Sequence, residues 1–172
     1  MTDKAYQTKK WLNRLIDLYD RAEKLRNQIN VMESYINNAV SNYENSGRGR
    51  ADLIVRQQQR EDALLTYSMK QAEYDKEYMK FVREELITIN VLDRMENRRH
   101  AVLLFDRYIN RLKWEDIIKS KRYDLKKSQL LNHHTQALEE LALLLATEEP
   151  RAIQETDKAI HTALERIKQA TA

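Results

Sequence analysis

The chain has 172 residues, which is the length of one ordinary domain or of a small domain with a long helical extension. It contains two glycines and one proline, which leaves little material for tight hairpins or glycine-rich phosphate loops, and 33% of its residues are charged. It has no cysteine, which excludes disulfides, thiolate nucleophiles and cysteine-ligated metal centres. The composition predicts an all-α protein. Since we find no apolar run of about 18 residues and no signal-peptide core, we expect a cytoplasmic protein that binds no membrane.

Positive charge is concentrated in one segment of the chain. Residues 94–127 carry 11 lysines and arginines against 5 acidic residues, an excess of six positive charges. By contrast, residues 1–93 are balanced at 15 and 15, and residues 139–172 carry 4 basic against 7 acidic residues. Such a segment is typical of a protein that binds a polyanion, because each neutralised phosphate releases counterions. A solvated helix face is the alternative interpretation.

The N-terminal part of the chain predicts a coiled-coil helix beginning near Asp3. Its apolar residues alternate at spacings of 4 and 3, which is the pattern of a heptad seam. The seam consists of Trp11, Leu15, Leu18, Ala22, Leu25, Ile29, Met32, Ile36 and Ala39. A helix of this length, about 43 Å at 1.5 Å per residue, needs a partner helix.

The partner is expected to be the next helix in the chain. Both glycines lie in residues 44–50, which predicts a reversal, and Asp52 is a candidate N-cap for a second helix over residues 53–92. Its apolar register is weaker and consists of Ile54, Leu65, Ala72, Met79, Val82, Leu86 and Ile89. Residues 1–93 are therefore predicted to form a coiled-coil helical hairpin for oligomerisation. The weaker seam leaves apolar surface on the first helix unmatched, which favours a homodimer.

Shorter helices are predicted over residues 94–146. The first spans about 96–110 and ends at Asn110, which tolerates the left-handed conformation. A helix of only two turns begins at Trp114, and Asp124 is a candidate N-cap for a third, longer helix. The predicted apolar stripe of this third helix consists of Leu130, Leu131, His134, Ala137, Leu138, Leu141 and Leu145. These proportions are typical of a helix-turn-helix module, whose last helix enters the major groove of DNA.

The last segment, residues 147–172, predicts one more amphipathic helix. Pro150 suits the first turn of a helix, and Glu148 and Glu149 suit its positive N-terminal dipole. This helix is expected to pack against the protein or a second copy, with docking on RNA polymerase or another partner as the alternative.

The third helix of the predicted module carries candidate DNA-binding residues on its outer face. Lys126, Gln129, His133 and Gln136 share one stripe, with Lys127 and Asn132 beside it. Glutamine and asparagine can bond adenine and lysine can donate to guanine, so Lys126, Gln129, Asn132 and His133 are predicted to read bases. Lys119, Lys121 and Arg122 in the preceding turn are predicted to hold phosphates. An exposed polar helix face is the alternative.

The segments YINRLKWEDIIKSKRYD and HTQALEEL resemble region four of bacterial sigma factors and, more closely, phage and prophage late-gene transcriptional regulators of the ArpU and RinA type. The matching residues are Tyr108, Trp114, Glu115, Ile117, Tyr123, Asp124, His134, Ala137 and Leu138. The resemblance implies a sequence-specific regulator of phage late genes that binds double-stranded DNA in the host nucleoid, with RNA polymerase as a further candidate partner. A small terminase subunit that binds packaging-site DNA and a coiled-coil adaptor that binds no DNA are the alternatives.

Other chemistry finds little support in the sequence. His133 and His134 are adjacent, so their side chains diverge on a helix, and neither has a histidine or cysteine one turn away. Carboxylate pairs such as Glu84 with Glu85 are helix-surface neighbours, and no catalytic-triad or nucleotide-binding motif is present. We therefore expect no enzyme activity, no metal and no cofactor.

Overall fold

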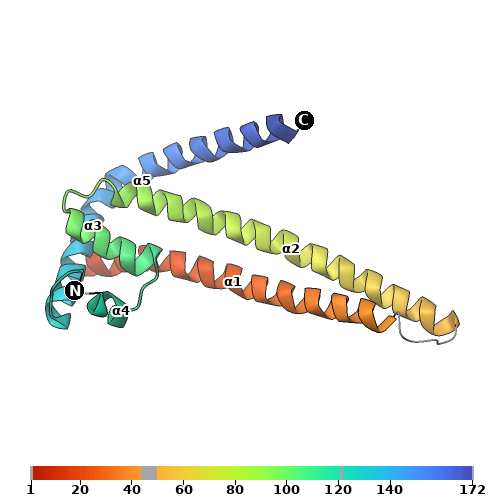
Figure 1. Ribbon diagram of the computed structural model, residues 1–172. Helices are drawn as coiled ribbons and strands as arrows, with labels where there is room; N and C mark the ends of the chain where they lie inside the picture. Colours follow the sequence, from red (N-terminus) through yellow and green to blue (C-terminus); the bar gives the residue numbers. More distant parts are fainter. Residues whose placement is uncertain (1, 44–49, 121, 172) are drawn as a thin grey trace. The chain divides into compact units, whose positions relative to one another are not determined.

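The computed structural model describes residues 2–43, 50–120 and 122–171 (Figure 1). Within these ranges it contains five α-helices and one π-helical turn and no strand, which confirms the all-α fold. The helices are α1 (Asp3–Tyr43), α2 (Arg50–Leu92), α3 (Arg98–Leu104), α4 (Trp114–Lys119) and α5 (Lys127–Thr171), with the turn η1 (Phe105–Ile109) following α3. The chain divides into two compact units, Leu18–Lys80 and a second one made of residues 2–17 and 81–171.

In the unit Leu18–Lys80, α1 and α2 run side by side in opposite directions (Figure 1). The predicted heptad seam of α1 is confirmed over its described part, because Ala22 and Ile29 are buried and Leu25, Met32 and Ile36 are half-buried. The side chain of Ala39 and the predicted reversal at residues 44–49 lie outside the described residues. Helix α2 already begins at Arg50, so Asp52 lies inside the helix.

The predicted seam of α2 is wrong over most of its length, although Val82 and Ile89 are half-buried and the side chain of Ile54 lies outside the described residues. Its i, i+7 row of Leu65, Ala72, Met79 and Leu86 is exposed, with 63% of the surface of Leu65 accessible. The less exposed face of α2 instead carries an aromatic row at the same heptad spacing, in which two half-buried tyrosines lead to a buried phenylalanine. This row consists of Tyr67, Tyr74 and Phe81. Tyrosine packs its ring while its hydroxyl stays near water, so it can line a helix pair as well as an aliphatic residue.

The other unit has a continuous apolar core built from several helices. Residues of α1 and the end of α2 pack there against α3, η1 and the first half of α5. The most completely buried large side chains of this core are Leu12, Leu15, Ile87, Val91, Leu92, Leu104, Leu138 and Leu141. The predicted apolar stripe of the third module helix is therefore confirmed at Leu138 and Leu141.

Helix α5 is continuous where two helices were expected. It contains Pro150 in its interior, which lacks the amide hydrogen that would bond back to Ala146. A proline at such a position bends a helix, and α5 changes direction along its length (Figure 1). Beyond this point Ile160 is half-buried and Leu164 and Ile167 are exposed.

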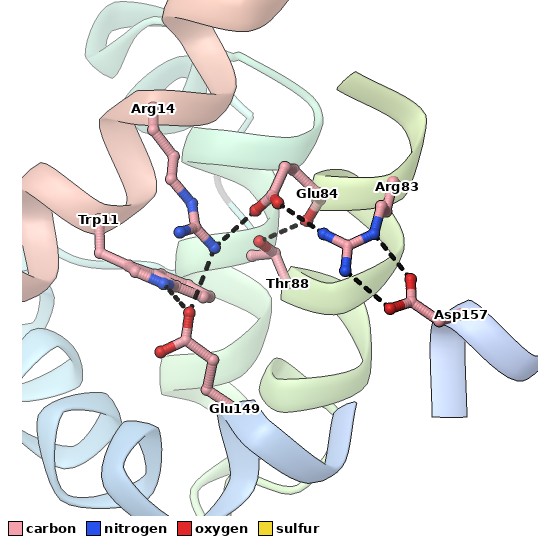
Figure 2. Close-up of polar contacts among 7 residues, drawn as sticks. All are labelled: Trp11, Arg14, Arg83, Glu84, Thr88, Glu149 and Asp157. Atoms are coloured by element: carbon pink, nitrogen blue, oxygen red, sulfur yellow. Dashed lines mark hydrogen bonds and ion pairs between the residues drawn. The ribbon is translucent and has the colours of Figure 1, made fainter. Parts of the chain in front are cut away.

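A polar network holds α5 at the bend (Figure 2). Glu149 Oε1 accepts a hydrogen bond from Trp11 Nε1 at 2.6 Å and lies 3.4 Å from Arg14 Nη2. The same arginine nitrogen forms an ion pair with Glu84 Oε2 at 2.6 Å. Because Trp11 and Arg14 belong to α1 and Glu84 to α2, one acidic residue beside Pro150 links three helices.

Candidate nucleic-acid interface

A small apolar cluster holds the predicted helix-turn-helix region together. Leu103 of α3, Ile117 of α4 and Leu130 of α5 are almost fully buried and pack on one another. Partly buried side chains close this small core, namely those of Leu112, Trp114, Ile118, Tyr123 and Leu125. Since each of the three elements contributes one buried residue, α4 and the start of α5 are held in a fixed arrangement.

The connection between η1 and α4 depends on Arg111. This residue has φ 55°, while Asn110 has φ −74°, so the left-handed residue lies one position later than predicted. Arg107 Nη1 donates to the carbonyl of Leu112 at 2.9 Å, and its guanidinium lies over the ring of Trp114. Arg107, which belongs to the basic segment of the sequence, thus holds the turn before α4.

A buried histidine joins α5 to η1 and α4. His134 of α5 contacts the Tyr108 hydroxyl through Nε2 at 3.1 Å and meets the ring of Trp114 edge-on at 5.0 Å. Burial lowers the pKa of His134 from 6.5 to about 4, and the charges of Lys9 and Arg107 act in the same direction. Burial also raises the pKa of Tyr108 to about 12. Both groups are therefore neutral at physiological pH, and His134 is a core residue.

A buried carboxylate organises the turn between α4 and α5. Asp106 of η1 accepts hydrogen bonds from Arg122 Nη1 at 2.8 Å, from the Tyr123 hydroxyl at 2.7 Å and from Asn110 Nδ2 at 3.0 Å. Burial, together with the hydrogen bond to Asp106, raises the pKa of the Tyr123 phenol. A π-helical turn presents its side chains differently from an α-helix and is often found at functional sites.

Helix α5 begins with a cap that the sequence did not predict. Asp124 has φ 44° and precedes the helix by three residues, so it is not the N-cap. The carbonyl of Lys126 instead accepts the first helical hydrogen bond, from the amide of Leu130 at 2.9 Å. The backbone amide of Lys126 donates to Gln129 Oε1 at 3.0 Å. This is the reciprocal half of a capping box, in which the residue three positions into the helix bonds back to the start.

The predicted DNA-binding residues remain accessible with one partial exception. His133 is half-buried, and its ring centroid lies 5.8 Å from that of His100. Lys121 lies outside the described residues. The exposed members are Lys119, Arg122, Lys126, Lys127, Gln129, Asn132 and Gln136, and we call them the α4–α5 surface.

Part of this surface borders a cleft between α4 and α5. Lys126 and Gln129 line it together with Ile117 and Ile118 of α4. Gln136 lies two turns further along α5 and is not part of the cleft. The structure thus places the first turn of α5 next to α4. Asn132 and Gln136, which were also predicted to bind DNA, lie further along α5.

Sequence reasoning missed Asp106 and the His100–Glu140 pair. His100 Nδ1 lies 2.7 Å from Glu140 Oε2, which connects the start of α3 to α5. Asp106 stands among the apolar residues of its helix, and a lone carboxylate at such a position is a signal for a buried, paired acid. Asn110 is four residues away, but Arg122 and Tyr123 come from the turn after α4, so the sequence gives no sign that they pair with Asp106.

In residues 2–43, 50–120 and 122–171, no three histidine or acidic side chains are grouped so that they could hold a metal ion. None of the helices in the same ranges has both the length and the apolar character needed to cross a membrane.

No family model, curated protein or solved structure matches this chain. The resemblance to phage regulators around Tyr108 and Trp114 therefore stays a prediction from short motifs. What the chain can bind follows from the charges and hydrogen-bonding groups of the α4–α5 surface.

Proposed function

We propose that this protein binds double-stranded DNA through the α4–α5 surface. The observation that carries the proposal is a difference between the three lysines of this surface and its one arginine, Arg122, which pairs with Asp106. Lys119, Lys126 and Lys127 are exposed, and none of them forms an ion pair with a carboxylate of the described residues. Their charges are thus available to phosphates of a nucleic acid, where neutralisation releases counterions.

Two arginines of the same basic segment, Arg94 and Arg122, form ion pairs within the protein. Arg94 pairs with Glu148 and Glu155, at 2.8 and 2.6 Å. Arg122 pairs with the buried Asp106, although 59% of its side chain remains accessible. We therefore assign the phosphate contacts first to the lysines, and expect Arg122 to contribute mainly by positioning the turn.

The amide-bearing residues of the α4–α5 surface suit sequence reading. Gln129, Asn132 and Gln136 are exposed along one side of α5, and no acidic residue lies between Lys126 and Gln136. Amide side chains can match the donors and acceptors of base edges in the major groove. We propose that the protein is a sequence-specific transcriptional regulator in the host nucleoid. From the resemblance to phage late-gene regulators, we further propose that it controls phage late genes and contacts RNA polymerase.

We also propose that the protein acts as a homodimer. The exposed heptad row of α2, with Leu65, Ala72 and Met79 and with Met69 beside it, is the kind of apolar stripe that pairs with another helix. The unmatched surface is thus on α2 rather than on the seam of α1. Two copies joined in this way would present two DNA-binding surfaces, as regulators with paired half-sites do.

The test compares Lys119→Ala with Lys158→Ala, which removes the same exposed charge from α5 outside the α4–α5 surface. Fluorescence anisotropy with a mixed-sequence duplex gives the affinity at several salt concentrations. We expect Lys119→Ala to weaken all duplexes equally and to flatten the slope of log K against log salt by about 0.9, with Lys158→Ala like wild type. Identical slopes for all three proteins would refute the role of Lys119. A ring-shaped oligomer would favour the small terminase subunit, and no binding would favour the adaptor.

A further inference from the structure

The hydrogen bond between Gln129 and Lys126 fixes which atoms of the Gln129 amide are available to a ligand. The backbone amide of Lys126 can only donate, so the atom that it meets at 3.0 Å must be the Oε1 acceptor. The Nε2 group of Gln129 has no hydrogen-bond partner among the described residues, and the side chain is exposed. In this arrangement Gln129 offers a ligand two N–H donors, while its oxygen is directed at the helix start, where the Lys126 amide occupies one of its two lone pairs.

The neighbouring side chains have the same character. Lys126 and Lys127 carry ammonium groups, which are donors only, and both are exposed. The first turn of α5 thus offers a cluster of donors. Asn132, one turn further on, makes no hydrogen bond within the described residues that commits either its oxygen or its nitrogen.

A donor cluster discriminates between the purines of the major groove. Adenine offers one acceptor, N7, and one donor, the N6 amino group, so a glutamine that reads it needs both its oxygen and its nitrogen. Guanine offers two adjacent acceptors, N7 and O6. Turning Gln129 to read adenine would leave the Lys126 amide without its cap, which destabilises the helix start.

We propose that the first turn of α5 reads guanine, with Gln129 Nε2 donating to N7 and Lys126 or Lys127 donating to O6. This inference rests on the proposed DNA binding and specifies the base that the surface recognises. It differs from the expectation that Gln129 reads adenine, which requires the Gln129 oxygen to turn from the Lys126 amide towards the adenine N6 amino group.

The experiment uses the full chain and a duplex selected from a randomised pool. Each guanine and each adenine of the selected duplex is then replaced in turn by its 7-deaza analogue, which lacks the N7 acceptor. The variant Gln129→Glu keeps an oxygen for the Lys126 amide but loses the N–H donors. Gln154→Glu introduces the same charge at an exposed position of α5 outside the α4–α5 surface and is the matched control.

For wild type, we expect 7-deazaguanine at one position to weaken binding about 10-fold, within the range of a specific base contact. The same replacement should have no effect on Gln129→Glu at that position and the full effect on Gln154→Glu. The measured quantity is the ratio of affinities for the two duplexes, so a general loss from the added negative charge cancels. Thermal unfolding of Gln129→Glu at or above the wild-type temperature would show that the cap is kept.

Two results would overturn the inference. If 7-deazaadenine weakens wild type at the position that depends on Gln129, or if guanine replacement is without effect, the donor assignment is wrong while DNA binding stands. If the wild-type protein binds no duplex at all, the proposed function fails and the inference fails with it.

Discussion

Arg122 Nη1 lies 2.8 Å from Oδ2 of Asp106, so the most obvious cation of the α4–α5 turn is paired inside the protein. The aspartate side chain is only 4% accessible, and its other hydrogen bonds come from Tyr123 and Asn110. This contact holds the turn that leads into α5 against η1. The ion pair of Arg122 thus positions the turn of the α4–α5 surface, while Lys119, Lys126 and Lys127 are available to a ligand.

The first prediction concerns the stability that Asp106 provides. Asp106→Ala leaves three donors without their acceptor and should lower the free energy of unfolding by about 3 kcal/mol. Arg122→Ala removes an exposed partner and should cost about 1 kcal/mol. Urea unfolding measures both values, with Glu96→Ala, an exposed acidic residue, as the control within about 0.5 kcal/mol of wild type. Equal losses for Asp106→Ala and Glu96→Ala would contradict this role.

The second prediction concerns pH. His134 has a pKa of about 4 in the folded protein against 6.5 as its ordinary value, so between these values the unfolded chain binds the proton and the folded chain does not. Stability is therefore full above about pH 6.5 and falls as the pH is lowered towards 4, by up to about 3 kcal/mol from this residue. His134→Gln should show a smaller fall in urea unfolding between pH 7.5 and 5. An unchanged fall would show that other groups cause it.

A third prediction tests the coupling between Trp11 and Glu149 that Figure 2 shows. Trp11→Phe and Glu149→Ala should each destabilise the protein, and the double variant should lose about 1 kcal/mol less than the sum of the two. Chemical unfolding of the four proteins of the cycle measures this difference. Strict additivity would mean that the 2.6 Å hydrogen bond contributes nothing to stability.

The fourth prediction concerns the exposed row of α2. Wild type is expected to sediment as a dimer at tens of micromolar, and Met69→Lys, which places a charge beside Leu65 and Ala72, should sediment as a monomer. Gln59→Lys adds the same charge to α2 at an exposed position outside the row and should remain dimeric. A monomeric wild-type protein would remove the homodimer from the proposal.

The sequence predicted helices best where aliphatic residues keep a strict period. The seam of α1 at Ala22 and Ile29 and the stripe of α5 at Leu138 and Leu141 follow this rule and are buried. In α2 two rows share the heptad spacing, and reasoning from aliphatic residues selected the exposed one. The aromatic row beginning at Tyr67 would have indicated the inward face.

Helical periodicity also predicted part of the α4–α5 surface. The exposure of Gln129 and Asn132 follows from the periodicity of α5, which the sequence shows directly. The pairing of Arg122 with Asp106 and the cap formed by Gln129 arise from the turn geometry after α4. Such contacts form only when the folded backbone brings the two residues together. A count of charges along the sequence cannot show that a cation such as Arg122 is paired within the protein.

The most direct test of the central claim is a titration of a labelled, mixed-sequence duplex with the full-length wild-type chain at 50 and 200 mM salt. If Lys119, Lys126 and Lys127 each neutralise one phosphate, the dissociation constant should rise about 40-fold between the two conditions. Binding that is absent at 50 mM salt, or that does not change with salt, would contradict the claim that these lysines bind the DNA backbone.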